Sequence, residues 1–458
     1  MTADLEPDLE GIIRARDFSA LRGKLENWEP ADLSRLITRL PVEDQVIVFR
    51  ILPRGLAADV FEYLDLAAQE VLLKAMAQDD VAALLNNMAP DDRTHLLDEL
   101  PAAVTKQLLS LLTPEERIIA TSLLGYPEDS IGRLMTPDYV SVRQDWTVEQ
   151  VLAHIRSHGQ DSETLSTIYV VDEGGVLIDS LRIRKILLAS PATRVSDLID
   201  HRVVALKASD DQETAISIFK REDRTALPVT DSLGVLIGIV TVDDVLDVAE
   251  SEATEDIQKI GGVEALEEPF LQVPLARFIR KRANWLVILF FGELLTATAM
   301  GFFEKEIERA VVLALFVPLI ISSGGNSGSQ ASTLVIRALA LEEIRLRDWW
   351  RVMRREVLAG LALGSILGAI GFLRIALWAV FFNAYGEHWF WVALTVGLAL
   401  IAIVLWGTLA GSMLPFLMRR LGFDPATSSA PFVATLVDVT GLLIYFGIAV
   451  VVLRGTLL

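Results

Sequence analysis

Apolar residues form five long stretches in the second half of the chain, and polar segments separate them. The stretches cover residues 284–303, 310–340, 356–382, 388–418 and 430–453. Each is long enough to cross a hydrocarbon core of about 30 Å as a helix. The longer ones have room to tilt or to extend beyond the bilayer. The pattern therefore predicts five transmembrane helices.

Lysine and arginine occur in alternate polar segments around these stretches. The basic segments are RFIRKR at 277–282, a segment with Arg345, Arg347, Arg351, Arg354 and Arg355, and the pair Arg419 and Arg420. Basic loops tend to stay on the cytoplasmic side of a membrane. We therefore expect the N-terminus in the cytoplasm and, after five spans of the cytoplasmic (inner) membrane, the C-terminus outside.

The first part of the chain repeats with a period of 12 residues. Leucine or methionine recurs at this spacing, at Leu40, Leu52, Leu64, Met76, Met88, Leu100 and Leu112. Prolines follow several of these positions. A helix of two turns and a connecting turn fit into each period, so residues 1–130 are expected to form an all-α superhelical solenoid.

A second repeat has an offset of 59 residues. YVVDEGGVLIDSLRIRKIL at 169–187 aligns with PVTDSLGVLIGIVTVDDVL at 228–246, and each copy predicts a strand, a tight turn, a strand and a helix. With the segments that precede them, residues 131–249 form two β–α–β–β–α units that resemble a CBS-domain pair. Thr241 and Asp244 are spaced as in ribose-binding CBS modules, which makes ATP or another adenine nucleotide a candidate ligand. Alternatively, Asp244 caps the helix that begins there.

Charge divides the chain into two parts. Residues 1–270 contain 25 Lys/Arg and 50 Asp/Glu, a net charge of −25, whereas residues 271–458 contain 16 and 11. An acidic part of this kind repels nucleic acid and attracts cations, although acidity also serves solubility alone. The chain has no cysteine, which excludes disulfides and thiolate metal sites. The opening residues lack the apolar core of a signal peptide.

Two segments place polar groups within the predicted spans. Asp438 is the only ionisable residue of 430–453. A carboxylate at this depth costs roughly 2.5–3.5 kcal/mol, so it should face a partner or a wet cavity, the alternative being a protonated packing contact. PLIISSGGNSGSQAS at 318–332 combines glycines that can loosen or kink a helix with polar side chains such as Asn326. Such oxygen ligands suit a hard cation, with small-residue helix packing as the alternative. Glu293 is interpreted as one member of a packing pair, with a pore residue as the alternative.

An acidic helix is predicted directly before the membrane part. DDVLDVAESEATEDIQKIGG favours a helix over about 243–260. Its carboxylates stack at helical spacing, in the groups Asp244 with Asp247 and Glu252 with Glu255 and Asp256. Like charges in this arrangement destabilise a helix unless a cation neutralises them. A solvated acidic linker is the alternative interpretation.

Several long motifs resemble those of one family. SSGGNSGSQASTLVIRALAL, LRDWWRVMRRE, LPFLMRRLGFDP and PFVATLVDVTGLLIYF are similar to motifs of the bacterial MgtE family of magnesium channels, and DDVLDVAESEATEDIQKIG resembles its plug helix. The resemblance implies a helical solenoid at 1–130, tandem CBS domains at 131–249, a connecting plug helix at 250–275 and a five-helix transmembrane domain at 276–458. It also implies a homodimer in the lipid bilayer, without nucleic acid or an obligate protein partner.

The resemblance further implies a pore and a set of regulatory ligands for Mg²⁺. Asp438 matches the acidic pore residue and Ala434 a backbone contact near the ion, and Asn326 joins them from the polar segment. The implied regulatory ligands are Asp59, Asp91, Asp211, Glu213, Asp223, Asp244, Asp247, Glu252, Glu255 and Asp256. Without Mg²⁺ these carboxylates repel one another, and with Mg²⁺ they should condense and close the pore. His95, one turn after Asp91, departs from the pattern because neutral histidine is a poor Mg²⁺ ligand.

Two other function classes stay open at this point. One is an ion-coupled divalent cation transporter, and the other is a membrane-tethered Mg²⁺ sensor that transports nothing. The sequence contains neither a GxxxxGK[ST] loop nor a DKTGT segment, which argues against transport driven by ATP hydrolysis. Five scattered histidines without a nucleophile–base pair argue against an enzyme.

Overall fold

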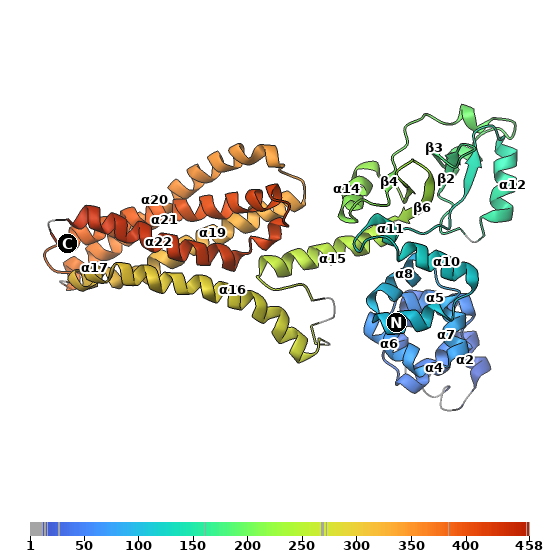
Figure 1. Cartoon of the computed structure of the whole chain (residues 1–458), viewed down its shortest axis with the longest axis horizontal. Helices are drawn as coiled ribbons and strands as arrows, with labels where there is room; N and C mark the ends of the chain where they lie inside the picture. Colours follow the sequence, from blue (N-terminus) through green and yellow to red (C-terminus); the bar gives the residue numbers. More distant parts are fainter. Residues whose placement is uncertain are drawn as a thin grey trace. The chain divides into compact units, whose positions relative to one another are not determined.

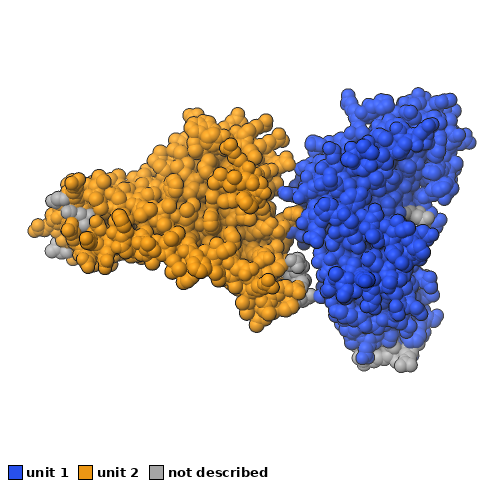
Figure 2. Space-filling model, in the orientation of Figure 1, with its two compact units in different colours: residues 1–251 blue, residues 252–458 orange. Residues whose placement is uncertain are grey.

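The chain divides into two compact units, residues 1–251 and residues 252–458 (Figure 2). The structure, a computed structural model, describes residues 12, 15, 17–25, 28–160, 162–266, 270–271, 273–382, 384–454 and 456–457. The opening residues 1–11 lie outside the described part. So do residues 267–269 and 272 of the predicted connecting segment.

Helices that begin 12 residues apart form the predicted solenoid in the described residues of unit 1 (Figure 1). They are α3 (Pro30–Ile37), α4 (Val42–Ile51), α5 (Arg54–Glu62), α6 (Leu66–Ala75), α7 (Gln78–Leu85), α8 (Pro90–Glu99), α9 (Ala102–Leu109) and α10 (Pro114–Leu123), preceded by α2 (Phe18–Leu25). Alternate helices contact each other, as α3 does α5 and α5 does α7. The repeating residues, such as Leu52, Leu64 and Met88, are buried just beyond the helix ends. The solenoid is therefore confirmed, with its core built from the periodic positions.

Two three-stranded sheets form the predicted CBS pair. In the first, β2 (Thr167–Val171) lies between β1 (Ser141–Arg143) and β3 (Leu177–Arg182); in the second, β5 (Ala226–Thr230) lies between β4 (Leu206–Lys207) and β6 (Leu236–Thr241). The helices of this region are α11 (Ile131–Leu134), α12 (Val148–His158), α13 (Ile183–Leu187), η1 (Val195–Asp197) and α14 (Glu213–Glu222). Thr167 faces Arg182 in one sheet and Ala226 faces Thr241 in the other, so the sequence offset is kept in the strand register.

Helix α15 (Val242–Ile260) begins directly after β6 and matches the helix predicted over about 243–260. Its first part belongs to unit 1, where Val245 and Val248 are buried. Its last turns, from Glu252 on, belong to unit 2.

The described part of unit 2 contains five helices long and apolar enough to cross a membrane (Figure 1). They are α16 (Leu275–Phe302), α19 (Val317–Ala340), α20 (Trp349–Phe382), α21 (Trp389–Arg420) and α22 (Ala430–Leu453), with the short α17 (Glu304–Arg309), α18 (Val311–Ala314), η2 (Leu346–Asp348) and η3 (Pro425–Thr427) between them. Helix α21 contacts α19, α20 and α22, whereas α16 packs along α22. Helix α21 is therefore the centre of the bundle.

Helices α19 and α21 cross with their backbones in contact. A Cβ atom on Gly407 would lie 2.4 Å from the carbonyl oxygen of Gly324, and one on Gly411 would lie 2.1 Å from that of Gly328. Only glycine allows such an approach. The expected loosening of this segment is not observed, because α19 is one continuous helix. Pro318 lies in the first turn, where its missing N–H removes no helical hydrogen bond.

Candidate functional site

Asp438 lies on α22, about 12 Å along the helix from its first residue. Asp438 and Ala434, one turn earlier, are half-buried, while Val433 and Val437 beside them are fully buried. A Cβ atom on Gly325 of α19 would lie 3.5 Å from the Ala434 Cβ and 3.8 Å from Asp438 Oδ1. The carboxylate therefore lies against a backbone surface of α19 that carries no side chain.

A polar stripe on α19 is exposed in the single chain. The stripe consists of Ser322, Asn326, Gln330 and Thr333. Within it, Asn326 Nδ2 donates to Ser322 Oγ at 3.4 Å. Ser329, in contrast, donates inward to the carbonyl oxygen of Ala430 at 3.0 Å. Polar side chains at membrane depth are tolerated against protein or water but not against lipid, so the stripe needs a hydrophilic neighbour.

Glu293 of α16 lies within electrostatic range of Asp438. Close packing of α16 on α22 explains this proximity, since a Cβ atom on Gly292 would lie 2.8 Å from Thr435 Cγ2. The sequence interpretation of Glu293 as a packing residue missed this pairing of carboxylates. Helical spacing within one span could not reveal it, because the two residues belong to different spans.

Lys259 connects the end of α15 with the segment that leads into α22. Its Nζ atom lies 2.5 Å from Glu255 Oε1 and 2.7 Å from Asp424 Oδ2. Burial by itself lowers the pKa of Lys259, but the two carboxylates outweigh it and raise the pKa overall. Burial, followed by repulsion from Asp424, raises the pKa of Asp256. Of the predicted ligands, Glu255 and Asp256 thus lie close together here, and Lys259 and Asp424 are residues that the sequence analysis missed.

Five carboxylates of unit 1 lie within electrostatic range of one or more of the others and are called here the acidic cluster. Its members are Glu62 of α5, Asp91 and Asp92 of α8, Glu163 of the loop before β2, and Asp244 of α15. Asp91 is 7% exposed, and its Oδ1 atom has no hydrogen-bond partner among the described residues. A buried, unpartnered carboxylate oxygen among other carboxylates fits a hard cation such as Mg²⁺. In the described part of the chain, no three such side chains converge as a complete cage, so a cation would have to draw them together.

The acidic cluster has raised pKa values throughout. Burial and then Asp92 raise the pKa of Glu62 to about 8, and burial and then Asp244 raise the pKa of Asp92 to about 7. Burial raises the pKa of Asp244 to about 6, although a hydrogen bond from Thr241 opposes it. The pKa values of Asp91 and Glu163 are also raised, by burial and then by the charge of Asp244. Without a metal, the cluster therefore holds protons near neutral pH.

The acidic cluster includes two predicted ligands, Asp91 and Asp244. Two more lie at its edge, because Asp59 acts electrostatically on Glu62 and Asp247 acts on Asp92. His95, noted above as a departure, is close enough to Asp247 to lower the pKa of that group, which burial raises.

Glu62, Asp92 and Glu163 are cluster members that the sequence analysis missed. Two of them had a local signal, since Asp92 follows Asp91 and Glu62 lies three residues after Asp59. Glu163 had none, because a loop brings it to the cluster.

The predicted ligands of α14 lie elsewhere. Asp211 Oδ1 accepts a hydrogen bond from the Glu213 backbone N–H at 2.9 Å, which places both at the helix start. Asp223 ends the same helix in a left-handed conformation, about 15 Å away along the axis. None of the three is among the largest influences on the pKa of Asp91 or Asp244. Glu252 lies on α15 at the start of unit 2.

The predicted nucleotide pair, Thr241 and Asp244, forms a local hydrogen bond. Thr241 Oγ1 donates to Asp244 Oδ2 at 2.5 Å, and the Thr241 backbone N–H donates to the same atom at 3.3 Å. Asp244 therefore caps the start of α15, as in the alternative to nucleotide binding given in the sequence analysis.

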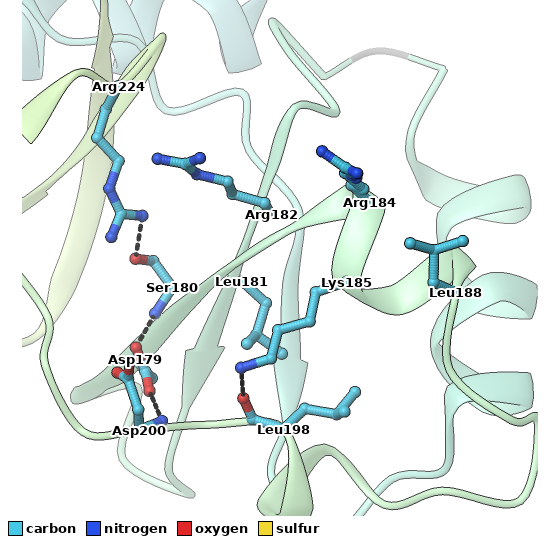
Figure 3. Close-up of a pocket in the computed structure, with 10 residues that line it drawn as sticks. All are labelled: Asp179, Ser180, Leu181, Arg182, Arg184, Lys185, Leu188, Leu198, Asp200 and Arg224. Atoms are coloured by element: carbon cyan, nitrogen blue, oxygen red, sulfur yellow. Dashed lines mark hydrogen bonds between the residues drawn. The ribbon is translucent and has the colours of Figure 1, made fainter.

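A pocket of about 340 Å³ in the first CBS unit is rich in cationic side chains (Figure 3). Arg182 of β3, Arg184 and Lys185 of α13, and Arg224 before β5 line it, together with Asp179 and Asp200. Arg224 Nη1 donates to Ser180 Oγ at 3.1 Å. By the offset of 59 residues, Arg182 and Lys185 stand where the second unit has Thr241 and Asp244. Lys185 and Asp244 thus place opposite charges at equivalent positions, and the cation Arg182 stands opposite the neutral Thr241.

Family models match most of the chain. A model described as divalent cation transporter matches residues 317–448, one described as MgtE intracellular N domain matches residues 28–129, and the CBS domain model matches residues 131–192 and 195–251. These ranges cover α19 to α22 of the bundle, the solenoid and the two β–α–β–β–α units.

Two curated relatives match nearly the whole chain. The magnesium transporter MgtE of Thermus thermophilus is 41% identical over 99% of this chain and 100% of its own length, and that of Bacillus subtilis is 31% identical over 95% and 94%. A crystal structure of the cytosolic domain of the Mg²⁺ channel MgtE in complex with ATP matches 53% of this chain and 100% of its own, at 39% identity and a TM-score of 0.51. Together with its five membrane-spanning helices, these similarities establish that this multi-pass membrane protein belongs to the MgtE family of divalent cation transporters.

Proposed function

We propose that the protein conducts Mg²⁺ into the cell through a pathway formed by two copies of α19 and α22. The polar stripe of α19 beside Asp438 is the observation that carries the proposal. A second copy of the chain would cover the stripe and would bring two Asp438 carboxylates to one axis. This arrangement suits Mg²⁺, which dehydrates reluctantly and binds through few carboxylates and its own water. Transport, and not an enzymatic reaction, is the function that these residues support.

Orientation follows from the basic segments. Lysine and arginine gather at the start of α16, around the start of α20 and at the end of α21. With these helix ends on the cytoplasmic side, α15 and both CBS units would lie in the cytoplasm of the cell and the C-terminus outside the inner membrane. The acidic cluster would then sample cytosolic Mg²⁺. Binding would relieve the repulsion among its carboxylates and favour the compact state in which α15 closes the pathway.

Flux measurements test the pore. Proteoliposomes with wild type, Asp438→Asn, Asn326→Ala and the exposed loop variant Glu387→Gln would be compared at low and then high Mg²⁺ on the cytoplasmic face. We expect Asp438→Asn to reduce the Mg²⁺ flux at least tenfold relative to wild type, Asn326→Ala to reduce it less, and Glu387→Gln to leave it unchanged. Equal flux in folded Asp438→Asn protein overturns the pore assignment. Saturable flux that follows an imposed ion gradient indicates the ion-coupled alternative, and no flux from wild type indicates the sensor.

The basic pocket of the first CBS unit favours an additional ligand. We infer that ATP or another adenine nucleotide binds this chain with its phosphates at Arg182, Lys185 and Arg224, since guanidinium and ammonium groups bind phosphate. The ATP complex of the related cytosolic domain supports a nucleotide. Calorimetric titration with ATP would compare Lys185→Glu and Thr241→Val; we expect a loss of affinity in the first only. A loss of affinity in Thr241→Val only would show that the nucleotide binds at Thr241 and Asp244 instead.

A further inference from the structure

A large apolar groove opens on the side of the membrane bundle. It has a volume of about 800 Å³ and lies among η2, the start of α20, the second half of α21 and α22. Its walls include Trp349, Met353 and Leu414, with Leu436 on the α22 side. Several wall residues remain well exposed in the single chain, at 48% for Trp349 and 38% for Trp406. In a bundle that spans a bilayer, lipid or another protein chain covers an open apolar surface of this kind.

The groove has the depth of one membrane leaflet. It reaches from Arg420, at the end of α21, to Trp406 on the same helix. At a rise of about 1.5 Å per residue, these two positions are about 21 Å apart along the axis. Half of a bilayer, headgroups included, measures about 20–22 Å. At the deep end, Trp406 Nε1 donates to Thr440 Oγ1 at 2.8 Å, so the polar edge of the indole is bonded to protein.

Positive charge is confined to the shallow end. Arg347 and Arg420 line the groove and are exposed, whereas the other lining residues are apolar. Within the described part of the chain, neither guanidinium forms an ion pair. Apolar walls below two free arginines match the chemistry of an anionic phospholipid, whose phosphate lies at the interface and whose chains lie below it. Basic pockets between transmembrane helices on the cytoplasmic side bind such headgroups.

We propose that the groove is a binding site for one anionic phospholipid of the cytoplasmic leaflet. The phosphate would lie between Arg347 and Arg420, and an acyl chain would follow α21 toward Trp406. The choice of leaflet rests on the proposed orientation of the chain; the site itself does not depend on Mg²⁺ transport. A lipid bound here would link η2 and α20 to the end of α21.

Native mass spectrometry of the full-length protein in detergent tests the site, with phosphatidylglycerol and phosphatidylcholine as probes. We expect wild type to retain phosphatidylglycerol preferentially. Arg347→Gln or Arg420→Gln should weaken this retention about fivefold, and both together about thirtyfold. Arg354→Gln, an exposed arginine of α20 outside the groove, is the matched control and should match wild type. Ala410→Trp, which fills the groove and keeps both arginines, should reduce retention of either lipid.

Each contrary result overturns the proposal. Equal retention of the two lipids, or equal effects of the double variant and Arg354→Gln, would show that the arginines do not select a headgroup. Unchanged binding by Ala410→Trp would place the lipid outside the groove. A second copy of the chain is the other candidate for covering the groove. Because the chain has no cysteine, a single cysteine introduced into the groove as Leu417→Cys can test this by disulfide formation. Disulfide-linked dimers of this variant would show that a second copy covers the groove instead.

Discussion

Lys259 Nζ lies 2.7 Å from Asp424 Oδ2, and this ion pair joins the last turns of α15 to the segment that leads into α22. Both side chains are only about one third exposed, at 28% and 35%. Asp438 is on the helix that follows Asp424. The Lys259–Asp424 ion pair therefore ties the end of α15 to the segment before α22, the helix that carries the proposed pore carboxylate.

Breaking this ion pair should weaken closure. In Lys259→Gln, we expect the Mg²⁺ concentration that halves the flux to rise about two- to fivefold, as for a partly exposed pair worth roughly 0.5–1 kcal/mol. Proteoliposome flux over a series of cytoplasmic-face Mg²⁺ concentrations measures the shift. Asp424→Asn should act alike, and the double variant should add little to either change. Fully additive effects would show that the two residues act separately.

Gly411→Ala should destabilise the bundle. The new Cβ would lie 2.1 Å from the Gly328 carbonyl oxygen, a backbone atom that cannot move without displacing α19. We expect a loss of about 1–3 kcal/mol or more in the free energy of unfolding, seen as a lower unfolding temperature in detergent. Gly447→Ala is the control, since nothing lies within 4 Å of a Cβ there. If both variants unfold at the wild-type temperature, the close crossing of α19 and α21 is wrong.

The Mg²⁺-free protein should lose stability as the pH rises. The carboxyl groups of the acidic cluster have native pKa values above their unfolded values, up to about 8 for Glu62. The native state then binds more protons than the unfolded state, so its stability is greatest at low pH and declines as these groups ionise. The decline should fall between about pH 5 and 8, and Mg²⁺ should restore stability mainly at the upper end. Thermal unfolding in chelator and in Mg²⁺ at several pH values tests this; Mg²⁺-free stability that rises with pH would contradict it.

Glu163→Gln should reduce the response to Mg²⁺. Removal of one charge from the acidic cluster lessens the repulsion without metal and the attraction for a cation. We expect higher stability in chelator and Mg²⁺ affinity lowered about fivefold, for a loss of roughly 1 kcal/mol. Calorimetric titration with Mg²⁺ would compare Glu163→Gln with the control Glu128→Gln, which changes an exposed carboxylate outside the cluster. If Glu163→Gln and Glu128→Gln behave alike, Glu163 does not take part in Mg²⁺ binding by the acidic cluster.

Local patterns were sufficient to predict the architecture. The period of 12 residues marks the start of successive solenoid helices, and the offset of 59 residues reappears in the pairing of Thr167 with Arg182 and Ala226 with Thr241. The apolar stretches likewise became five spanning helices. These features are encoded by neighbours in the chain, through helix and strand periodicity. The positions of Asp438 and α15 followed from the same patterns.

Contacts between distant segments required the tertiary structure. Glu163 reaches Asp91 and Asp244 from a loop, Lys259 pairs with Asp424 although four spanning helices separate them in the sequence, and Glu293 approaches Asp438 from another helix. No periodicity records these pairs, since the packing of whole helices decides them. The glycines of α19 show the division most clearly. Their composition suggested a loosened helix, but α19 is continuous, and its glycines allow the backbone of α21 to approach closely instead, because a residue without a side chain leaves room for van der Waals contact between backbones.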